Sequence, residues 1–165
     1  MHDDIRDAED GDLHGILTIH NRAVETSTAI FSFRPVDIEN RRAFLAERRA
    51  RGFPFLVAAS GRDVLGYASF GEFRPHDGYF RSVEHSVYVG EDHRRRGVAG
   101  RLMTALIERA HAMGKHVMVG GLDAANGPSI ALHERFGFAR VGLMPQVGFK
   151  FDRYLDLLFM QKILD

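Results

Sequence analysis

Hydrophobic and polar residues follow helical spacing in some segments of the chain and strand spacing in others. The first part predicts a short strand over residues 5–8, an amphipathic helix over 13–24, a loop over 26–35 and a helix from Asp37 to about Gly52. Asp37 is suited to cap this second helix, since its carboxylate can accept a hydrogen bond from a first-turn backbone N–H. The chain therefore begins as a strand followed by two helices.

The middle of the chain has the alternating spacing of strands. Segments 55–60 and 64–73 flank Ser60-Gly61-Arg62-Asp63, which predicts a hairpin turn. A polar and aromatic loop over 74–81 leads to a further strand over 82–90. Alternation puts two sets of side chains on opposite faces of that strand: Val83, His85, Val87 and Val89 on one face, and Glu84, Ser86 and Tyr88 on the other.

The last part of the chain changes between helix and strand. Its predicted elements are a helix from Gly97 to Gly114, a strand over 116–122, a helix over 126–136 closed by Gly137, and strands over 138–143 and 155–164. This order indicates an α/β fold with a mixed sheet.

Composition narrows the class of protein. A length of 165 residues with 45% hydrophobic residues fits one globular domain over 1–165. The 22 Lys and Arg balance 22 Asp and Glu, and zero net charge argues against a nucleic-acid partner. The absence of cysteine excludes a disulfide framework, a cysteine-ligated zinc site and a cysteine nucleophile. The nine His leave a His/carboxylate metal site as an alternative, but we expect no metal.

Membrane and export signals are not apparent in the sequence. Apolar runs such as Phe55-Leu56-Val57-Ala58-Ala59 are far shorter than the about 20 residues that a spanning helix needs. The acidic segment 1–7 lacks the apolar stretch of a signal peptide. We therefore expect a cytoplasmic protein without a membrane partner.

The strongest local motif is the basic turn Arg94-Arg95-Arg96-Gly97-Val98-Ala99-Gly100 between a strand and a helix. Unpaired N–H groups and the positive end of the helix dipole favour an anion there, and the arginines add full charges. The pattern is neither a P-loop nor a dinucleotide fingerprint. It predicts a pyrophosphate site, and a solvated helix start with incidental arginines is the alternative.

A second basic cluster lies in the predicted helix that follows Asp37. Its members are Arg41, Arg42, Arg48, Arg49 and Arg51. A solvated helix face that offsets the acidic N-terminus accounts for it, and a role facing a cofactor or a partner is the alternative.

Further along the chain, Asn126-Gly127-Pro128-Ser129 precedes Leu132-His133-Glu134-Arg135-Phe136-Gly137-Phe138. The turn Arg94-x-x-Gly97-x-Ala99 is similar to the phosphate signature Gln/Arg-x-x-Gly-x-Gly/Ala of the GCN5-related N-acetyltransferase (GNAT) superfamily. The order of these motifs from about Leu65 to Phe138 resembles the acyl-CoA-binding core of that family.

The resemblance narrows to a subgroup on four further segments. These are Gly66–Gly71, Val83–Val89, His116–Val119 and Met144–Phe151. They resemble the phosphinothricin N-acetyltransferases and, more closely, bacterial members that acetylate methionine sulfoximine and methionine sulfone. The resemblance implies a central mixed twisted sheet of six to seven strands flanked by helices, direct acetyl transfer in a ternary complex, and a homodimer.

The same resemblance implies acetyl-CoA as cosubstrate and assigns residues to it. The strand around Val87, Tyr88 and Val89 is expected to bind the pantetheine arm through its backbone, as an added strand would. The basic turn is expected to hold the pyrophosphate with Arg94, Arg95, Arg96, Gly97, Val98, Ala99, Gly100 and Arg101. Asn126 and Ser129 are expected beside the cofactor arm, although helix capping explains Asn126 as well.

Two residues are the candidates for proton transfer. The attacking amine must lose its proton, and Glu84 is the candidate base, with a structural salt bridge as the alternative. His133 stands where many family members have a tyrosine that protonates the leaving thiolate, and an ordinary pKa near 6.5 would suit that task. A packing role for His133 is the alternative, and Tyr88 or water are the other candidate acids. His85 is expected to face away from Glu84.

The loop after residue 73 is the candidate acceptor site. Arginine can capture a carboxylate with two hydrogen bonds, which makes Arg74 and Arg81 candidates for the acceptor's carboxylate. The substrate-binding candidates are Arg74, Asp77, Gly78, Tyr79, Arg81 and Glu84, and Phe31 and Phe33 are candidates for a wall of the same pocket. An ordinary exposed loop is the alternative. Peptide N-terminal acetylation and a non-catalytic acetyl-CoA sensor are the competing functions.

Overall fold

The computed structural model describes residues 4–164. Residues 1–3, which belong to the segment interpreted above as unlike a signal peptide, lie outside the described part. The strands are β1 (Asp4–Asp7), β2 (Phe55–Ser60), β3 (Asp63–Glu72), β4 (Ser82–Val89), β5 (Val117–Asp123), β6 (Ala139–Lys150) and β7 (Arg153–Ile163). The helices are α1 (Leu13–Thr26), α2 (Ile38–Ala50), α3 (Val98–Ala112) and α4 (Gly127–Arg135), with short 3₁₀ turns η1 (Asp10–Asp12), η2 (Asp77–Tyr79) and η3 (Glu91–His93).

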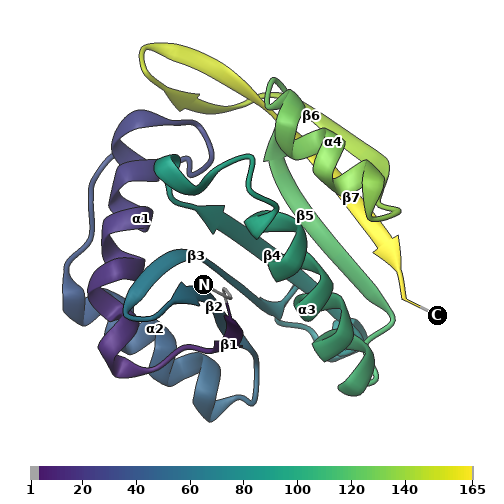
Figure 1. Ribbon diagram of the computed structural model, residues 1–165. Helices are drawn as coiled ribbons and strands as arrows, with labels where there is room; N and C mark the ends of the chain where they lie inside the picture. Colours follow the sequence, from purple (N-terminus) through teal and green to yellow (C-terminus); the bar gives the residue numbers. More distant parts are fainter. Residues whose placement is uncertain (1–3, 165) are drawn as a thin grey trace.

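The strands form one mixed sheet in the order β1-β2-β3-β4-β5-β7-β6 (Figure 1). All neighbours are antiparallel except β4 and β5, which are parallel and connected through α3. A parallel pair needs such a crossover, because its second strand must start at the same end as the first. The predicted mixed sheet of six to seven strands is confirmed, since the sheet has seven strands.

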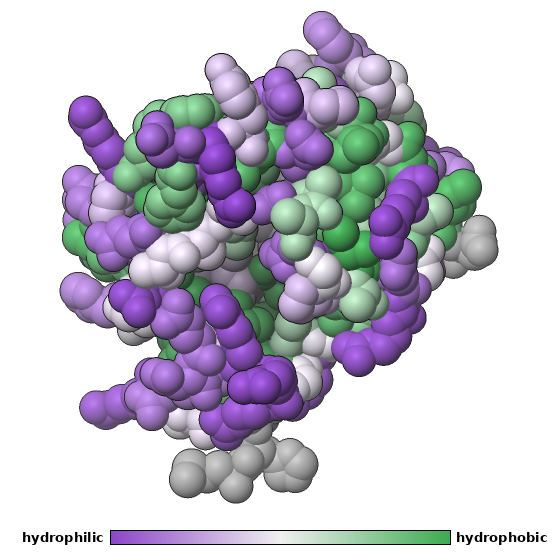
Figure 2. Space-filling view, turned by 90° about the horizontal axis from the view of Figure 1, so that it is seen from above, coloured by the Kyte–Doolittle hydropathy of each residue, from purple (hydrophilic) through white to green (hydrophobic). Residues whose placement is uncertain are grey.

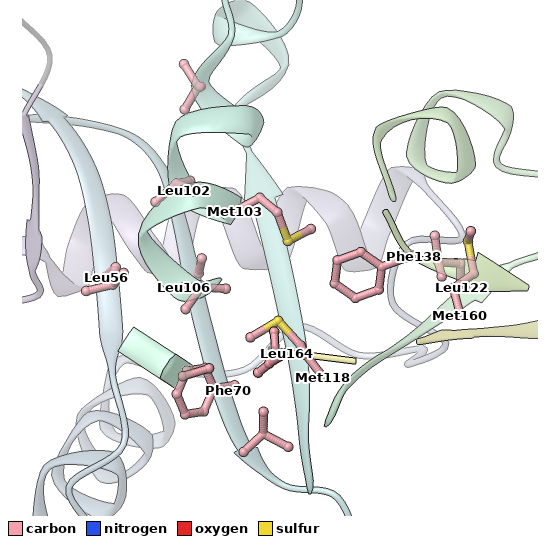
Figure 3. Close-up of a cluster of buried hydrophobic side chains, with 14 of the residues drawn as sticks. Leu56, Phe70, Leu102, Met103, Leu106, Met118, Leu122, Phe138, Met160 and Leu164 are labelled. Carbon is pink, nitrogen blue, oxygen red and sulfur yellow. The ribbon is translucent and has the colours of Figure 1, made fainter. Parts of the chain in front are cut away.

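Two helical layers cover the sheet (Figure 1). Helices α1 and α2 bury one face with residues such as Leu13, Ile16 and Leu45. Helices α3 and α4 bury the other face, where Leu102 and Leu106 pack with Met118 and Phe138 (Figure 3). Successive residues of β4 consequently face different layers, since strand side chains alternate.

The predicted caps agree with the structure. The Asp37 carboxylate accepts a hydrogen bond of 2.8 Å from the Asn40 N–H at the start of α2. Gly114 and Gly137 follow α3 and α4 with φ of 65° and 83°, a left-handed conformation that glycine adopts without a Cβ clash. Within residues 4–164, none of these helices has both the length and the hydropathy to cross a bilayer.

The final hairpin differs from the prediction. Strand β6 continues to Lys150, beyond the predicted end at residue 143, with register shifts between Met144 and Gly148. These irregularities break the alternation that sequence reading relies on. Phe151 and Asp152, with φ of 52° and 58°, form the two-residue turn that joins β6 to β7.

The basic cluster of α2 forms ion pairs on its own layer. Arg49 lies 2.9 Å from Asp10, and Arg42 lies 3.6 Å from the same carboxylate. Arg48 and Arg51 pair with Glu47 at 2.7 and 3.2 Å. Only Arg41 of this cluster is buried, and its guanidinium donates to Asn40. These contacts support the interpretation as an outer helix face.

Candidate active site

The parallel strands β4 and β5 separate halfway along their length. They pair only over Ser82–His85 and Val117–Gly120, whereas β4 continues to Val89 and β5 to Asp123. The sheet therefore opens at the carboxyl end of two parallel strands, where α/β proteins commonly bind ligands.

The backbone beside this opening has polar groups directed into it. Hydrogen bonds from Gly90 N–H to the Leu65 carbonyl (2.9 Å) and from Phe73 N–H to the Ser82 carbonyl (3.3 Å) show that even-numbered residues of β4 bond to β3. Backbone groups alternate in direction, so those of Val87 and Val89 point toward β5, which does not pair with them. The backbone of Tyr88 bonds to β3 instead, and a contact of this residue with the cofactor stays a prediction.

The basic turn lies at the same end of the sheet, because it follows β4 directly. Arg94, Arg95 and Arg96 are exposed, and Arg95 is left-handed with φ of 59°. Gly97 precedes α3 with φ of 76°, a conformation that a side chain would strain. The positive end of α3 thus faces solvent beside the opening, as a pyrophosphate site requires.

The remaining residues of this turn begin α3. Val98 is buried and anchors the helix, while Ala99, Gly100 and Arg101 are half-buried. A Cβ on Gly100 would lie 3.8 Å from the Phe136 ring, so α3 comes close to α4 there.

The start of α4 shows the capping role of Asn126. Its Oδ1 accepts a hydrogen bond of 3.2 Å from the Ser129 N–H. The second role, a contact of Asn126 or Ser129 with the cofactor arm, stays a prediction.

Glu84 lies on the α1 side of the sheet, at the base of the opening. Its Oε1 is 3.5 Å from the position that a Cβ on Gly121 would take, so the glycine leaves room for the carboxylate. The Arg74 guanidinium lies 3.6 Å from the Glu84 carboxylate. The Glu84 side chain is 37% exposed and the Arg74 side chain 46%. The salt bridge that was the alternative role of Glu84 therefore leaves both groups accessible to an acceptor. Burial raises the pKa of Glu84, and the positive charge of Arg74 opposes that rise.

The two candidate arginines are not equivalent. Arg74 stacks on the Phe73 ring at 4.2 Å and reaches Glu84. Arg81 instead donates to the Gly114 carbonyl after α3, at 3.2 Å. This contact holds the Arg81 guanidinium at the closed end of the parallel pair, so the geometry favours Arg74 for the acceptor's carboxylate, and the role of Arg81 stays a prediction. Asp77 and Gly78 are exposed in η2.

A groove runs over the sheet from Glu84. Val119 is the register partner of Glu84 on β5 and lines a cavity of about 400 Å³. The complete lining is Phe73, Tyr79, Ser82, Val117, Val119, Val141, Gly142, Phe159 and Gln161. Phe159 joins the two regions, since its ring and the Glu84 carboxylate both approach Gly121. Seen from above, the molecule shows a hollow with hydrophobic surface beside it and hydrophilic side chains around it (Figure 2).

Two histidines occupy the opposite face of the same opening. His85 and His133 are 7% and 5% exposed, their rings stack with centroids 5.0 Å apart, and their Nε2 atoms are 3.2 Å apart. His133 Nδ1 lies 2.7 Å from the Ser129 carbonyl and must donate to it. Neutral His133 therefore accepts at Nε2, and His85 donates there.

This arrangement favours the packing alternative for His133, and its role as general acid stays a prediction. Its Nε2 carries no proton to transfer, and burial lowers its pKa. Burial, with the neighbouring His133, lowers the pKa of His85 to about 3. Both rings are neutral at neutral pH, so the packing interpretation of His133 agrees better with the structure.

Sequence reading missed the contacts that attach the loop between α1 and α2. The Thr28 hydroxyl donates to the buried Asp123 carboxylate, and the Lys150 ammonium bonds three backbone carbonyls. Single polar residues at strand ends carry no periodic signal, because their partners lie far away in the chain.

Comparison with known proteins agrees with this geometry. The family model described as the acetyltransferase (GNAT) family matches residues 16–138. An L-methionine sulfoximine/L-methionine sulfone acetyltransferase of Pseudomonas aeruginosa is 53% identical over 98% of this chain and 94% of its own length.

Solved structures show the same fold. A putative acetyltransferase from Salmonella typhimurium with its cofactor acetyl-CoA superposes with a TM-score of 0.95 at 46% identity, covering 98% of this chain and 94% of its own. A ribosomal-protein-alanine N-acetyltransferase from Brucella melitensis has a TM-score of 0.95 at 49% identity, covering 97% and 99%. The chain belongs to the acetyltransferase (GNAT) family and is an N-acetyltransferase.

Proposed function

We propose that this chain transfers an acetyl group from acetyl-CoA to the α-amino group of a small amino-acid analogue of the methionine sulfone, methionine sulfoximine or phosphinothricin type. The observation that carries the proposal is the accessible Glu84 carboxylate at the sheet opening, with an apolar groove beside it. The activity printed for the Pseudomonas aeruginosa relative, which aligns with nearly the whole chain, supports the substrate class.

The cofactor side of the opening supplies backbone groups and positive charge. Val87 and Val89 offer N–H and C=O groups that can bond the pantetheine amides as a neighbouring strand would. The Arg94–Gly100 turn receives the pyrophosphate, with Gly97 allowing close approach and Asn126 beside the arm. Acetyl-CoA supplies the thioester, and a backbone N–H near Val87 stabilises the oxyanion.

The acceptor side supplies the base and the pocket. Glu84 accepts the proton of the acceptor's ammonium, directly or through water, so that the neutral amine attacks. Arg74 pairs with the acceptor's carboxylate and keeps the Glu84 proton affinity from rising further. The groove past Val119 and Phe159 receives the acceptor's side chain. Water is the preferred proton source for the thiolate, because the neutral His133 accepts at Nε2.

The experiment that tests this function is a panel of amines assayed for release of the CoA thiol. Methionine sulfone, methionine sulfoximine and phosphinothricin should be acetylated at the α-amino group, as mass spectrometry of the products would show. Wild-type protein that binds acetyl-CoA but does not release the CoA thiol with any amine of the panel would contradict the proposal and support a sensor.

The panel includes peptides, because the groove is open at its rim. Tyr79 and Phe80 are 42% and 68% exposed. An open groove is what a peptide N-terminus would require, and the Brucella melitensis structure has a protein acceptor in its name. Faster acetylation of alanine-terminated peptides than of free amino acids would replace the small-molecule proposal.

We also propose a homodimer. Strand β6 is a sheet edge, and the final hairpin has seven large apolar side chains that are 45–65% exposed: Val141, Leu143, Met144, Val147, Phe149, Phe151 and Tyr154. So much exposed apolar surface on one hairpin is typical of an interface. Light scattering should give twice the mass of 18.6 kDa, and Leu143→Asp should favour the monomer.

A further inference from the structure

Lys150 is a buried cation at the end of β6 that the proposed reaction does not use. Its side chain is nearly inaccessible, with 3% of the residue exposed. Its ammonium donates hydrogen bonds of 2.5, 2.7 and 2.7 Å to the carbonyls of Val24, Ser27 and Ile30. An ammonium has three donors, so all of them are used on one short stretch of backbone.

The surroundings of this charge are unusual for a lysine. No ion pair joins it to a carboxylate within residues 4–164. Its counter-charge is the carboxyl end of α1, since Val24 lies in the last turn of that helix. Removal from water lowers the pKa of Lys150, and the three carbonyls offset this cost together with the Phe151 ring, whose centroid lies 4.9 Å from the ammonium.

The bonded stretch is the start of the loop that joins α1 to α2. Two further contacts attach that loop to the β5–β7 side of the sheet. The Thr28 hydroxyl donates to Asp123 at the end of β5, and the Phe31 ring lies against Gly148 of β6. A Cβ on Gly148 would lie 2.6 Å from the Phe31 ring, so only glycine leaves room for the ring at this position.

These attachments lie on the face of the sheet that carries Glu84. Gly148 pairs with Leu155 on β7, and Leu157, two residues further, approaches Gly121 beside the Glu84 carboxylate. Side chains two residues apart share a face, so Phe31 stands on the acceptor side of the opening. The loop has no helix or strand between Ser27 and Asp37 that would hold it otherwise.

We propose that Lys150 is a positioning residue for the acceptor site: its ammonium fixes the loop after α1 so that Phe31 forms a wall of the acceptor pocket. The inference rests on the proposed function. Lys150 itself does not touch the acceptor. Without it, the loop would have to be ordered at each binding event, at a cost in conformational entropy that falls on the acceptor alone. The pantetheine side, at Val87 and Val89, would be unaffected.

The test compares Lys150→Met with Lys150→Arg and with Lys162→Met, a control that removes a lysine charge from β7. Lys150→Met should raise the acceptor KM about tenfold or more, since small misplacements in a site are costly, and leave the acetyl-CoA KM within about twofold. Lys150→Arg should recover part of the loss. Hydrogen exchange of amides 27–33 should quicken in Lys150→Met while β2 and β3 stay protected.

Gly148→Ala provides a second variant if Lys150→Met does not fold. It displaces Phe31 and keeps the charge, and it should also raise the acceptor KM selectively. Unchanged exchange of the loop, or equal rises of both KM values, would overturn the proposal. The exchange measurement needs no substrate: if no amine is acetylated by the wild type, faster exchange confined to 27–33 still supports Lys150 as the loop anchor, and the proposed function alone fails.

Discussion

The two faces of the β4–β5 opening carry ionisable groups at adjacent positions of β4, and these groups differ in their access to solvent. On one face, the Glu84 carboxylate is 37% exposed and has an accessible cation, Arg74, beside it. On the other face, His85 is 7% exposed and stacks on His133 beneath α4. Both groups lie over glycines of β5, Gly121 and Gly120, which leave space for them.

The difference shows that position on the sheet, rather than residue type, separates chemistry from packing here. A group that exchanges a proton with a substrate needs access and a charged form that water or a partner stabilises. The histidines lack both, because they are enclosed and neutral. One strand therefore presents an accessible carboxylate on one face and a buried imidazole on the other, one residue apart.

The largest expected effect concerns the face that carries Glu84. Glu84→Gln keeps the shape of the side chain and removes the base, so kcat/KM should fall by about 10²–10⁴-fold. Binding of acetyl-CoA, measured by calorimetry, should change little. The backbone groups of Val87 and Val89, which we propose bind the pantetheine arm, lie further along β4 than Glu84. A variant that keeps wild-type kcat/KM at neutral pH would exclude Glu84 as base.

Burial of His85 on the packed face should make the folded state less stable in acid. The pKa of His85 is about 3 in the folded chain against an ordinary 6.5, so below pH 6.5 the unfolded chain takes up a proton that the folded chain refuses. The free energy of unfolding therefore has its full value above pH 6.5 and is lower by about 2 kcal/mol at pH 5. Urea unfolding of wild type and His85→Phe should show a shallower pH slope in the variant. Equal slopes would contradict it.

A smaller effect concerns the cofactor turn. Gly97→Ala places a side chain at φ of 76°, at a cost of about 1–2 kcal/mol. The acetyl-CoA KM should rise about five- to thirtyfold and the acceptor KM should stay unchanged. Gly11→Ala is the matched control, because that glycine has open space and an ordinary φ. A rise in the acceptor KM alone would show that this turn does not serve the cofactor.

The smallest effect is a shift in pH dependence. The proposed base must be ionised to accept a proton, so the rate should fall as pH drops through the raised pKa of Glu84. Arg74 lowers that pKa, and Arg74→Met should move the acidic limb of kcat/KM to higher pH. A limb that moves to lower pH would show that Arg74 does not act on Glu84.

Much of this arrangement was readable from the sequence. Alternation in 82–90 correctly separated Glu84 from His85, and Asp37, Gly114 and Gly137 marked helix ends. Such signals are local, because strand period and caps depend on residues within a few positions. The prediction for β6 stopped too early, since its register shifts hide the alternation.

The sequence by itself determined the family, the order of strands and helices, and the segments that we propose meet acetyl-CoA and the acceptor, because these follow from periodicity and from motifs of neighbouring residues. Only the tertiary structure decided which groups cooperate. It brought Arg74 to Glu84 and held Arg81 at Gly114. It also joined His133 to His85, and Lys150 to a loop 120 or more residues earlier. The physical reason is that sheet register and helix packing set distances between residues far apart in the chain, and burial then sets their charge.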